Sequence, residues 1–115
     1  AQNKTLVTPC IENSDFVRAE RLGTCGTVLT VEGGAVLGGN LDNIPYLASC
    51  GVRMLTLTWN GTCEFGDGAM VTHPKGLTKF GRKAIPKLEQ QRIVVDISHA
   101  SEPLFYDAAE IASHW

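Results

Sequence analysis

The chain has 115 residues, of which 43% are hydrophobic, and a formal net charge of −2 at pH 7. This length allows one domain, the hydrophobic content excludes a disordered chain, and the charge argues against a nucleic-acid partner. No apolar run approaches the roughly 20 residues of a membrane-spanning helix, so we expect no transmembrane segment. The first residues show no signal-peptide pattern, and we expect a cytoplasmic location.

The four cysteines show no C-x-x-C pairing. Three of them stand beside apolar residues or glycines, a setting typical of buried thiols. The sequence therefore predicts buried free thiols in preference to disulfides. The residues concerned are Cys10, Cys25, Cys50 and Cys63.

The first quarter of the chain predicts an irregular segment and then a helix. Residues 1–11 contain threonines and a proline without a clear period, so we expect residues 1–12 to be a linker. Residues 15–22 are expected to form a helix, with Asn13 or Ser14 as its N-cap. The predicted inner face of this helix consists of Phe16, Ala19 and Leu22.

A first strand is expected over residues 26–31, followed directly by Glu32 and two glycines. A glutamate before Gly33 and Gly34 is commonly a solvated carboxylate in a turn. The alternative is a ligand or acid/base group, with glycines that let backbone or metal approach closely. Both interpretations stay open at this point.

The middle of the chain predicts a helix over residues 41–50, a second strand over 52–58 and a helix over 78–91 capped by Thr78. The long glycine-rich loop between them, residues 60–76, is of a length that often carries function. Its histidine, His73, precedes a proline, and we interpret it as a surface residue rather than a ligand.

The third predicted strand is the β-branched run at residues 93–95, which ends in Asp96, Ser98 and His99. A run without alternation is typical of a strand buried in a parallel sheet. Ser101 then begins a helix to the end of the chain. Its apolar stripe is Leu104, Ala108, Ile111 and Trp115. The order of elements predicts an α/β fold with parallel strands in βαβαβα order.

Because the carboxyl ends of parallel strands lie at one edge of the sheet, Glu32 and His99 are expected to lie at the same edge. A carboxylate and an imidazole are both zinc ligands. The alternative is a polar rim in which His99 hydrogen-bonds Asp96 or a backbone carbonyl.

Four motifs occur in a distinctive order: Val-Glu-Gly-Gly at residues 31–34, Gly-Val-Arg-Met-Leu-Thr-Leu-Thr-Trp-Asn at 51–60, Gly-Leu-Thr-Lys-Phe-Gly at 76–81 and Val-Asp-Ile-Ser-His at 95–99. Together they resemble the renal (membrane) dipeptidase family, zinc peptidases of the amidohydrolase-like type. The resemblance implies that the chain is a partial (β/α)8 TIM barrel, and that a water between two zinc ions attacks the carbonyl of a dipeptide substrate.

The resemblance also implies roles for individual residues. Glu32, at the end of the third barrel strand, would be the catalytic carboxylate that bridges two zinc ions, and His99, at the end of the fifth strand, would bind the second zinc. Trp59 and Asn60 would contact substrate. Mammalian members have a histidine at the position of Trp59 that helps to polarise the substrate carbonyl, so the tryptophan puts this role in doubt.

The family's first-strand His-x-Asp pair, its later zinc-binding histidine, its substrate-binding arginine and its catalytic aspartate have no counterpart here. A complete barrel takes about 250 residues. We therefore expect residues 1–115 to be the central part of a barrel, inactive in isolation. Because a partial barrel exposes sheet edges, we also expect it to form a homo-oligomer. The competing hypothesis is a non-catalytic α/β binding or assembly module.

Overall fold

A three-stranded parallel sheet is the centre of the structure, a computed structural model that describes residues 6–113. Its strands are β3 (Leu29–Glu32), β4 (Val52–Thr56) and β7 (Val94–Asp96), in the order β3-β4-β7. Both neighbouring pairs are parallel. The predicted mixed α/β fold with parallel strands is confirmed for the described residues.

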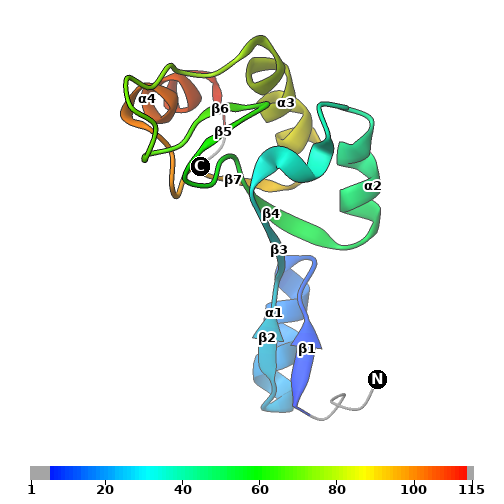
Figure 1. Cartoon of the computed structure of the whole chain (residues 1–115). Helices are drawn as coiled ribbons and strands as arrows, with labels where there is room; N and C mark the ends of the chain where they lie inside the picture. The colour runs from blue at the N-terminus through cyan, green and yellow to red at the C-terminus, as the bar shows by residue number, and fades with distance from the viewer. Residues whose placement is uncertain (1–5, 114–115) are drawn as a thin grey trace.

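Helices connect these strands and lie around β4 and β7 (Figure 1). The 3₁₀ helix η1 (Gly34–Leu37) and helix α2 (Asn43–Ser49) join β3 to β4, and α3 (Lys79–Gln90) joins β4 to β7. Helix α4 (Glu102–Ile111) follows β7. As predicted, Thr78 caps α3, and its hydroxyl accepts a hydrogen bond from the Gly81 N–H at 3.0 Å.

The register assigns each strand residue to one face of the sheet. Val31, Leu55 and Val95 are partners across the three strands; Leu55 belongs to the buried core, and the partly buried Val31 and Val95 pack against it. Because successive residues alternate between faces, the preceding row points away from the helices. That row consists of Thr30, Met54 and Val94. Val94 is 59% exposed, so this face of the sheet is open to solvent at Val94.

The core lies between the sheet and helices α2, α3 and α4. Leu55 and Leu57 are fully buried and belong to one core cluster with side chains from each of these helices. The helical contributors are Ile44, Ala84, Ile85, Leu88, Leu104 and Ala108. This confirms the buried part of the stripe predicted for the last helix. Trp115, which was assigned to that stripe, lies outside the described residues.

An arm made of β1 (Val7–Pro9), α1 (Asn13–Leu22) and β2 (Cys25–Thr27) extends from the sheet (Figure 1). The strands β1 and β2 pair in parallel. The prediction of a linker is wrong for Val7–Pro9, and the single strand expected over residues 26–31 divides at Val28 into β2 and β3. The arm explains a radius of gyration of 15.6 Å, against about 13 Å for a compact domain of about 100 residues.

Helix α1 differs from its prediction at its start and on its face. Glu12 is the N-cap, and it forms a reciprocal capping box with Asp15. Ala19 is buried, but Phe16 and Leu22 are 47% and 62% exposed. The two-stranded ribbon of the arm is too narrow to cover the whole apolar face of the helix.

The long loop after β4 folds back over the sheet edge. It contains a small hairpin of β5 (Thr62–Cys63) and β6 (Gly66–Asp67), and Gly68 forms a β-bridge with Ala100. The predicted long loop therefore contains a short antiparallel hairpin. The loop is fixed against the segment that follows β7.

The four cysteines are free thiols, as predicted. Their predicted burial holds only for Cys10, since Cys63 is half-buried and both Cys25 and Cys50 are exposed. Across residues 6–113, no helix has the length and apolarity that crossing a bilayer requires.

Candidate functional site

Three polar side chains share one row at the carboxyl ends of the parallel strands. Glu32 ends β3, Thr56 ends β4 and Asp96 ends β7, and the register aligns the three as partners. This row lies two residues beyond Thr30, Met54 and Val94, and therefore on the same open face of the sheet. The site is built on the edge where parallel α/β proteins place their ligands.

The carboxylate of Glu32 faces the imidazole of His99. Glu32 Oε1 and His99 Nε2 are 3.6 Å apart, and the two side chains are 59% and 35% exposed. Two ligand atoms at about 2.1 Å from one tetrahedral zinc are about 3.4 Å apart. The observed separation therefore fits a cation held between the two side chains. The structure brings together the two metal ligands predicted from the sequence, and it pairs the imidazole with Glu32 rather than with Asp96.

His99 has a backbone conformation that side chains rarely adopt. Its φ is +63°, a left-handed conformation that costs a residue other than glycine about 1–3 kcal/mol. The surroundings impose this conformation. The His99 carbonyl accepts hydrogen bonds from Thr58 Oγ1 at 3.2 Å and from the Ala69 N–H at 2.9 Å.

Asp96 ties the end of β7 to its neighbours. Its Oδ2 accepts a hydrogen bond from Thr56 Oγ1 at 2.6 Å, and its Oδ1 accepts from the N–H and the hydroxyl of Ser98 at 2.9 and 2.7 Å. Burial raises the pKa of Asp96, but the bonds from Thr56 and Ser98 and the nearby His99 outweigh it and leave the pKa below its ordinary value. Asp96 is therefore a carboxylate at neutral pH, and both of its oxygens are occupied.

Trp59 and Asn60 follow β4 and are both exposed. The Trp59 indole lies over the His99 imidazole, with the ring centroids 4.3 Å apart. The Asn60 carbonyl accepts a hydrogen bond from the Met70 N–H at 3.1 Å. Trp59 therefore contacts the candidate metal ligand directly, and Asn60 is held by the loop beside it.

The close packing of this loop depends on Gly68, which is buried. A Cβ atom at Gly68 would overlap the carbonyl oxygen of Trp59. Only a glycine lets the two backbone segments approach so closely. The loop after β4 is thus packed against both Trp59 and the carbonyl of His99.

The two glycines after Glu32 have separate structural roles. Gly33 has a φ of +99°, which favours glycine. A Cβ at Gly34 would overlap the ring of Phe65. The missing side chain of Gly34 therefore leaves space for the buried ring of Phe65. One interpretation of the sequence was that these glycines leave space for a metal instead.

Among the described residues, no group of three or more His, Cys, Asp or Glu side chains is placed to hold one metal ion. Glu32 and His99 form a pair of potential ligands. His73 is exposed, with a φ of +57°. This agrees with its interpretation as a surface residue.

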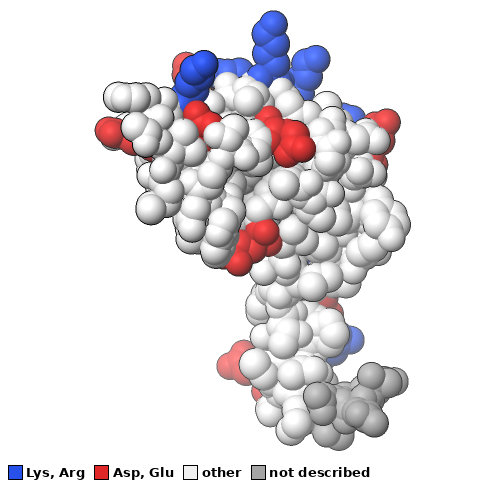
Figure 2. Space-filling view, viewed as in Figure 1, with Lys and Arg blue, Asp and Glu red and all other residues white. Residues whose placement is uncertain are grey.

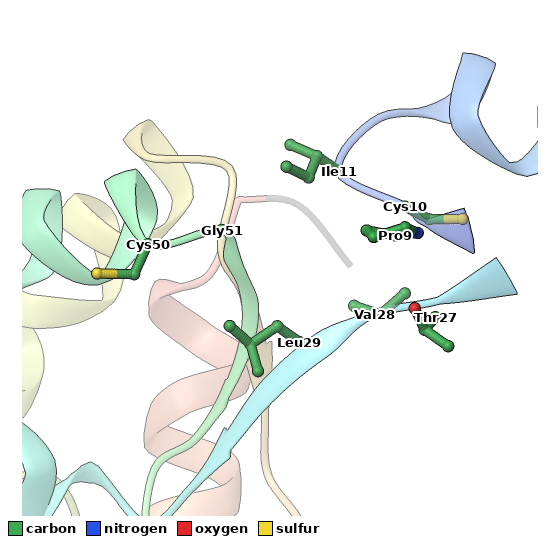
Figure 3. A pocket seen from close by; sticks show the side chains of 8 residues that line it. All are labelled: Pro9, Cys10, Ile11, Thr27, Val28, Leu29, Cys50 and Gly51. Atoms are coloured by element: carbon green, nitrogen blue, oxygen red, sulfur yellow. The ribbon is translucent and has the colours of Figure 1, made fainter. Parts of the chain in front are cut away.

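Two other surface features lie away from this edge. A hollow of about 260 Å³ is lined by residues 9–11, 27–29 and 50–51, at the start of β3 and β4 (Figure 3). The side chains of Cys10 and Cys50 there extend in opposite directions, so the hollow presents no thiol pair. Lys and Arg side chains gather around α3 (Figure 2). Two of them, Arg82 and Lys87, form ion pairs with Asp107 and Asp42.

The sequence singled out Glu32, His99, Trp59 and Asn60, and it offered Asp96 only as a hydrogen-bond partner of His99. It gave no role to Thr56, Thr58 or Gly68, which hold the site together. The threonines have no local signature, because their partners are 40 and 41 residues away. The burial of Gly68 has no signature in the sequence, and only the folded structure shows it.

This chain has a parallel α/β fold with a carboxylate–imidazole pair at the carboxyl edge of its sheet. It therefore falls in the class of α/β proteins whose functional sites lie at strand ends. The family described as Membrane dipeptidase (Peptidase family M19) matches residues 1–114. The chain belongs to this family. The competing hypothesis of a non-catalytic module has no support from this match.

Curated relatives agree with this assignment. Dipeptidase 3 of Macaca fascicularis is 28% identical over 134 residues, a match that covers 96% of this chain and 28% of the relative. Dipeptidase 3 of Homo sapiens is 31% identical over 91 residues, covering 74% of this chain and 19% of the relative. The chain therefore spans less than a third of the length of these two relatives.

Solved structures show the same fold. An amidohydrolase from Pseudomonas aeruginosa superposes with a TM-score of 0.94 at 20% identity, covering 97% of this chain and 34% of that one. A metallo peptidase from Rhodobacter sphaeroides, liganded with a phosphinate mimic of the dipeptide L-Ala-D-Ala, superposes with a TM-score of 0.86 at 24% identity. This match covers 96% of this chain and 33% of that one.

Proposed function

We propose that this chain contributes part of the metal-binding edge of a zinc-dependent dipeptidase. The observation that carries the proposal is the Glu32–His99 pair, whose 3.6 Å separation fits a shared zinc ion. The family assignment supports the substrate class, since its description is that of a dipeptidase. The dipeptide mimic bound to the Rhodobacter sphaeroides metallo peptidase is consistent with the same chemistry.

In this proposal Glu32 would be the catalytic carboxylate that holds both zinc ions, and His99 would hold the second. Zinc ions, when bound, lower the pKa of water and stabilise the negative charge that develops on a carbonyl oxygen. Trp59 and Asn60 contact the dipeptide. The indole of Trp59 offers an apolar surface and a single N–H donor, so it does not replace the proton chemistry of a histidine.

β3, β4 and β7 are proposed to be successive strands of a (β/α)8 barrel, with the open face of the sheet toward the barrel interior. The parallel order β3-β4-β7 and the helices on the opposite face support this arrangement. The site residues then lie at the carboxyl end of the strands, where barrel enzymes place their catalytic groups. Residues 1–115 alone are proposed to be inactive, because the described part brings only two potential ligands together.

The test is the variant Glu32→Gln in a polypeptide of the family's length that contains residues 1–115. A neutral amide does not bridge two cations as a carboxylate does, so dipeptide hydrolysis should fall at least 100-fold, equivalent to about 2.7 kcal/mol of transition-state stabilisation. The matched control is Glu64→Gln, the same change at an exposed loop glutamate. Turnover in Glu32→Gln equal to that of the control would contradict the proposed role of Glu32.

A further inference from the structure

We propose that Asp96 is a positioning residue that aims His99 at Glu32. The inference deepens the proposed function, and it rests on the role of His99 as a metal ligand there. Asp96 stands three residues before His99, at the last position of β7. Its carboxylate is the point at which the strand, the neighbouring strand and the turn carrying His99 are joined.

The first step is the link between strands. Thr56 Oγ1 donates to Asp96 Oδ2 at 2.6 Å, and the Leu57 N–H donates to the Asp96 carbonyl at 3.0 Å. Thr56 is 4% exposed, so this hydrogen bond is shielded from water on the Thr56 side. The first bond fixes Oδ2 of Asp96 and the second fixes its main chain relative to β4, the strand that lies between β7 and Glu32.

The second step is the turn. The other oxygen of Asp96 accepts both the N–H and the hydroxyl of Ser98, a side-chain turn typical of aspartate. The Ala100 N–H then donates to the Ile97 carbonyl at 3.1 Å. The chain therefore reverses immediately after β7, and His99 takes its left-handed conformation within this reversal.

The third step is the separation of roles between Asp96 and the metal edge. Both oxygens of Asp96 already accept hydrogen bonds, whereas Glu32 Oε1 faces His99 Nε2. Glu32 and Asp96 lie on either side of Thr56 in one row. The row thus provides one carboxylate toward the imidazole and one that holds the turn presenting the imidazole.

The test uses the position of the His99 ring in the 115-residue chain, measured by NMR without added metal. The indole of Trp59 should shift the ring protons of His99 upfield, because the two ring centroids are 4.3 Å apart. In Asp96→Ala this upfield shift should fall by at least half. Asp96→Asn, which keeps one acceptor oxygen for Ser98, should restore most of it.

The matched control is Asp15→Ala, which removes a carboxylate that also accepts two backbone bonds, from Ile11 and Glu12, but in the arm. Its His99 shift should equal that of the unmodified chain. An unchanged His99 shift in Asp96→Ala would overturn the proposal. If Asp96→Ala does not fold, the double variant Thr56→Val/Ser98→Ala, which removes both side-chain hydrogen bonds to the Asp96 carboxylate, replaces it: a reduced shift supports the proposal and an unchanged shift overturns it.

Titration with zinc distinguishes this inference from the proposed function. If the His99 ring is displaced in Asp96→Ala, Asp96 is a positioning residue whether or not zinc binds. If zinc leaves the His99 signals unchanged in a polypeptide of the family's length that contains residues 1–115, the zinc role of His99 fails, while the positioning result stands. The two failures are therefore separate observations.

Discussion

The indole of Trp59 lies over the imidazole of His99, with ring centroids 4.3 Å apart and an interplanar angle of 38°. One residue follows β4 and the other follows β7, so the contact joins the ends of two neighbouring strands. Trp59 is still 48% exposed. One part of the indole packs against the candidate metal ligand, and the rest is available at the edge where we propose that substrate binds.

The isolated chain should bind zinc weakly or not at all, because the structure brings two potential ligands together where zinc sites have three or four. In a zinc titration followed by NMR, the signals of Glu32 and His99 should stay unchanged at micromolar zinc, and a shift at higher concentrations should affect the two residues together. His73 is an internal control, since it is an exposed histidine. Stoichiometric zinc retained after dialysis would contradict this expectation.

Gly68→Ala should displace the backbone of Trp59, because the new methyl group overlaps its carbonyl oxygen. Forcing extra volume into a packed site costs about 1–3 kcal/mol. Chemical denaturation should show this loss, and the upfield shift of the His99 ring should shrink. Gly61→Ala is the matched control, since a Cβ there meets no atom within 4 Å. Equal stability of the two variants would show that the loop adjusts without cost.

The hairpin beside the site should loosen in acid through Asp67. Hydrogen bonds from the Lys75 N–H and Thr62 Oγ1 lower the pKa of Asp67 in the folded state. A group with a lowered folded pKa stabilises the fold above its unfolded pKa, and this contribution is lost as pH falls through the folded value. The Lys75 amide signal should therefore titrate below the ordinary pKa of 3.8. Asp67→Asn should abolish the titration, and a midpoint at or above 3.8 would contradict the expectation.

The central sheet was predictable from sequence because each strand and helix there carries a long apolar signal. Residues 93–95 are a continuous β-branched run, and residues 78–91 have both a cap and a buried face. The strand Val7–Pro9 was missed because three residues with a threonine and a proline have no period, and pairing with β2 stabilises them. The outer face of α1 was misassigned because burial depends on what packs against the helix.

The part of the candidate site that depends on strand topology alone was predictable from the sequence. Parallel strands must bring Glu32 and His99 to one edge, and the sequence shows that both follow apolar runs. The alignment of Glu32, Thr56 and Asp96 depends on register, which a shift of one residue would reverse. The packing of Gly68 against Trp59 depends on the hairpin inside the long loop. Neither feature has a local pattern in the sequence.

The open face of the sheet leads to the last prediction, which concerns self-association of the 115-residue chain. Val94 is 59% exposed on this face, in the same row as Met54, and Val28 at the base of β3 is 42% exposed. Apolar surface in water costs about 25 cal/mol per Å², and unpaired strand edges are templates for pairing. We therefore expect the chain to form a homo-oligomer through this face.

Light scattering at micromolar concentration should give a mass above the 12.4 kDa of one chain. Val94→Lys places a charge on the open face and should shift the population toward monomer. Tyr106→Lys is the matched control, because Tyr106 is similarly exposed, at 64% against 59% for Val94, but lies on helix α4. A single 12.4 kDa species with cooperative unfolding in the unmodified chain would show that the open face is stable in water without a partner.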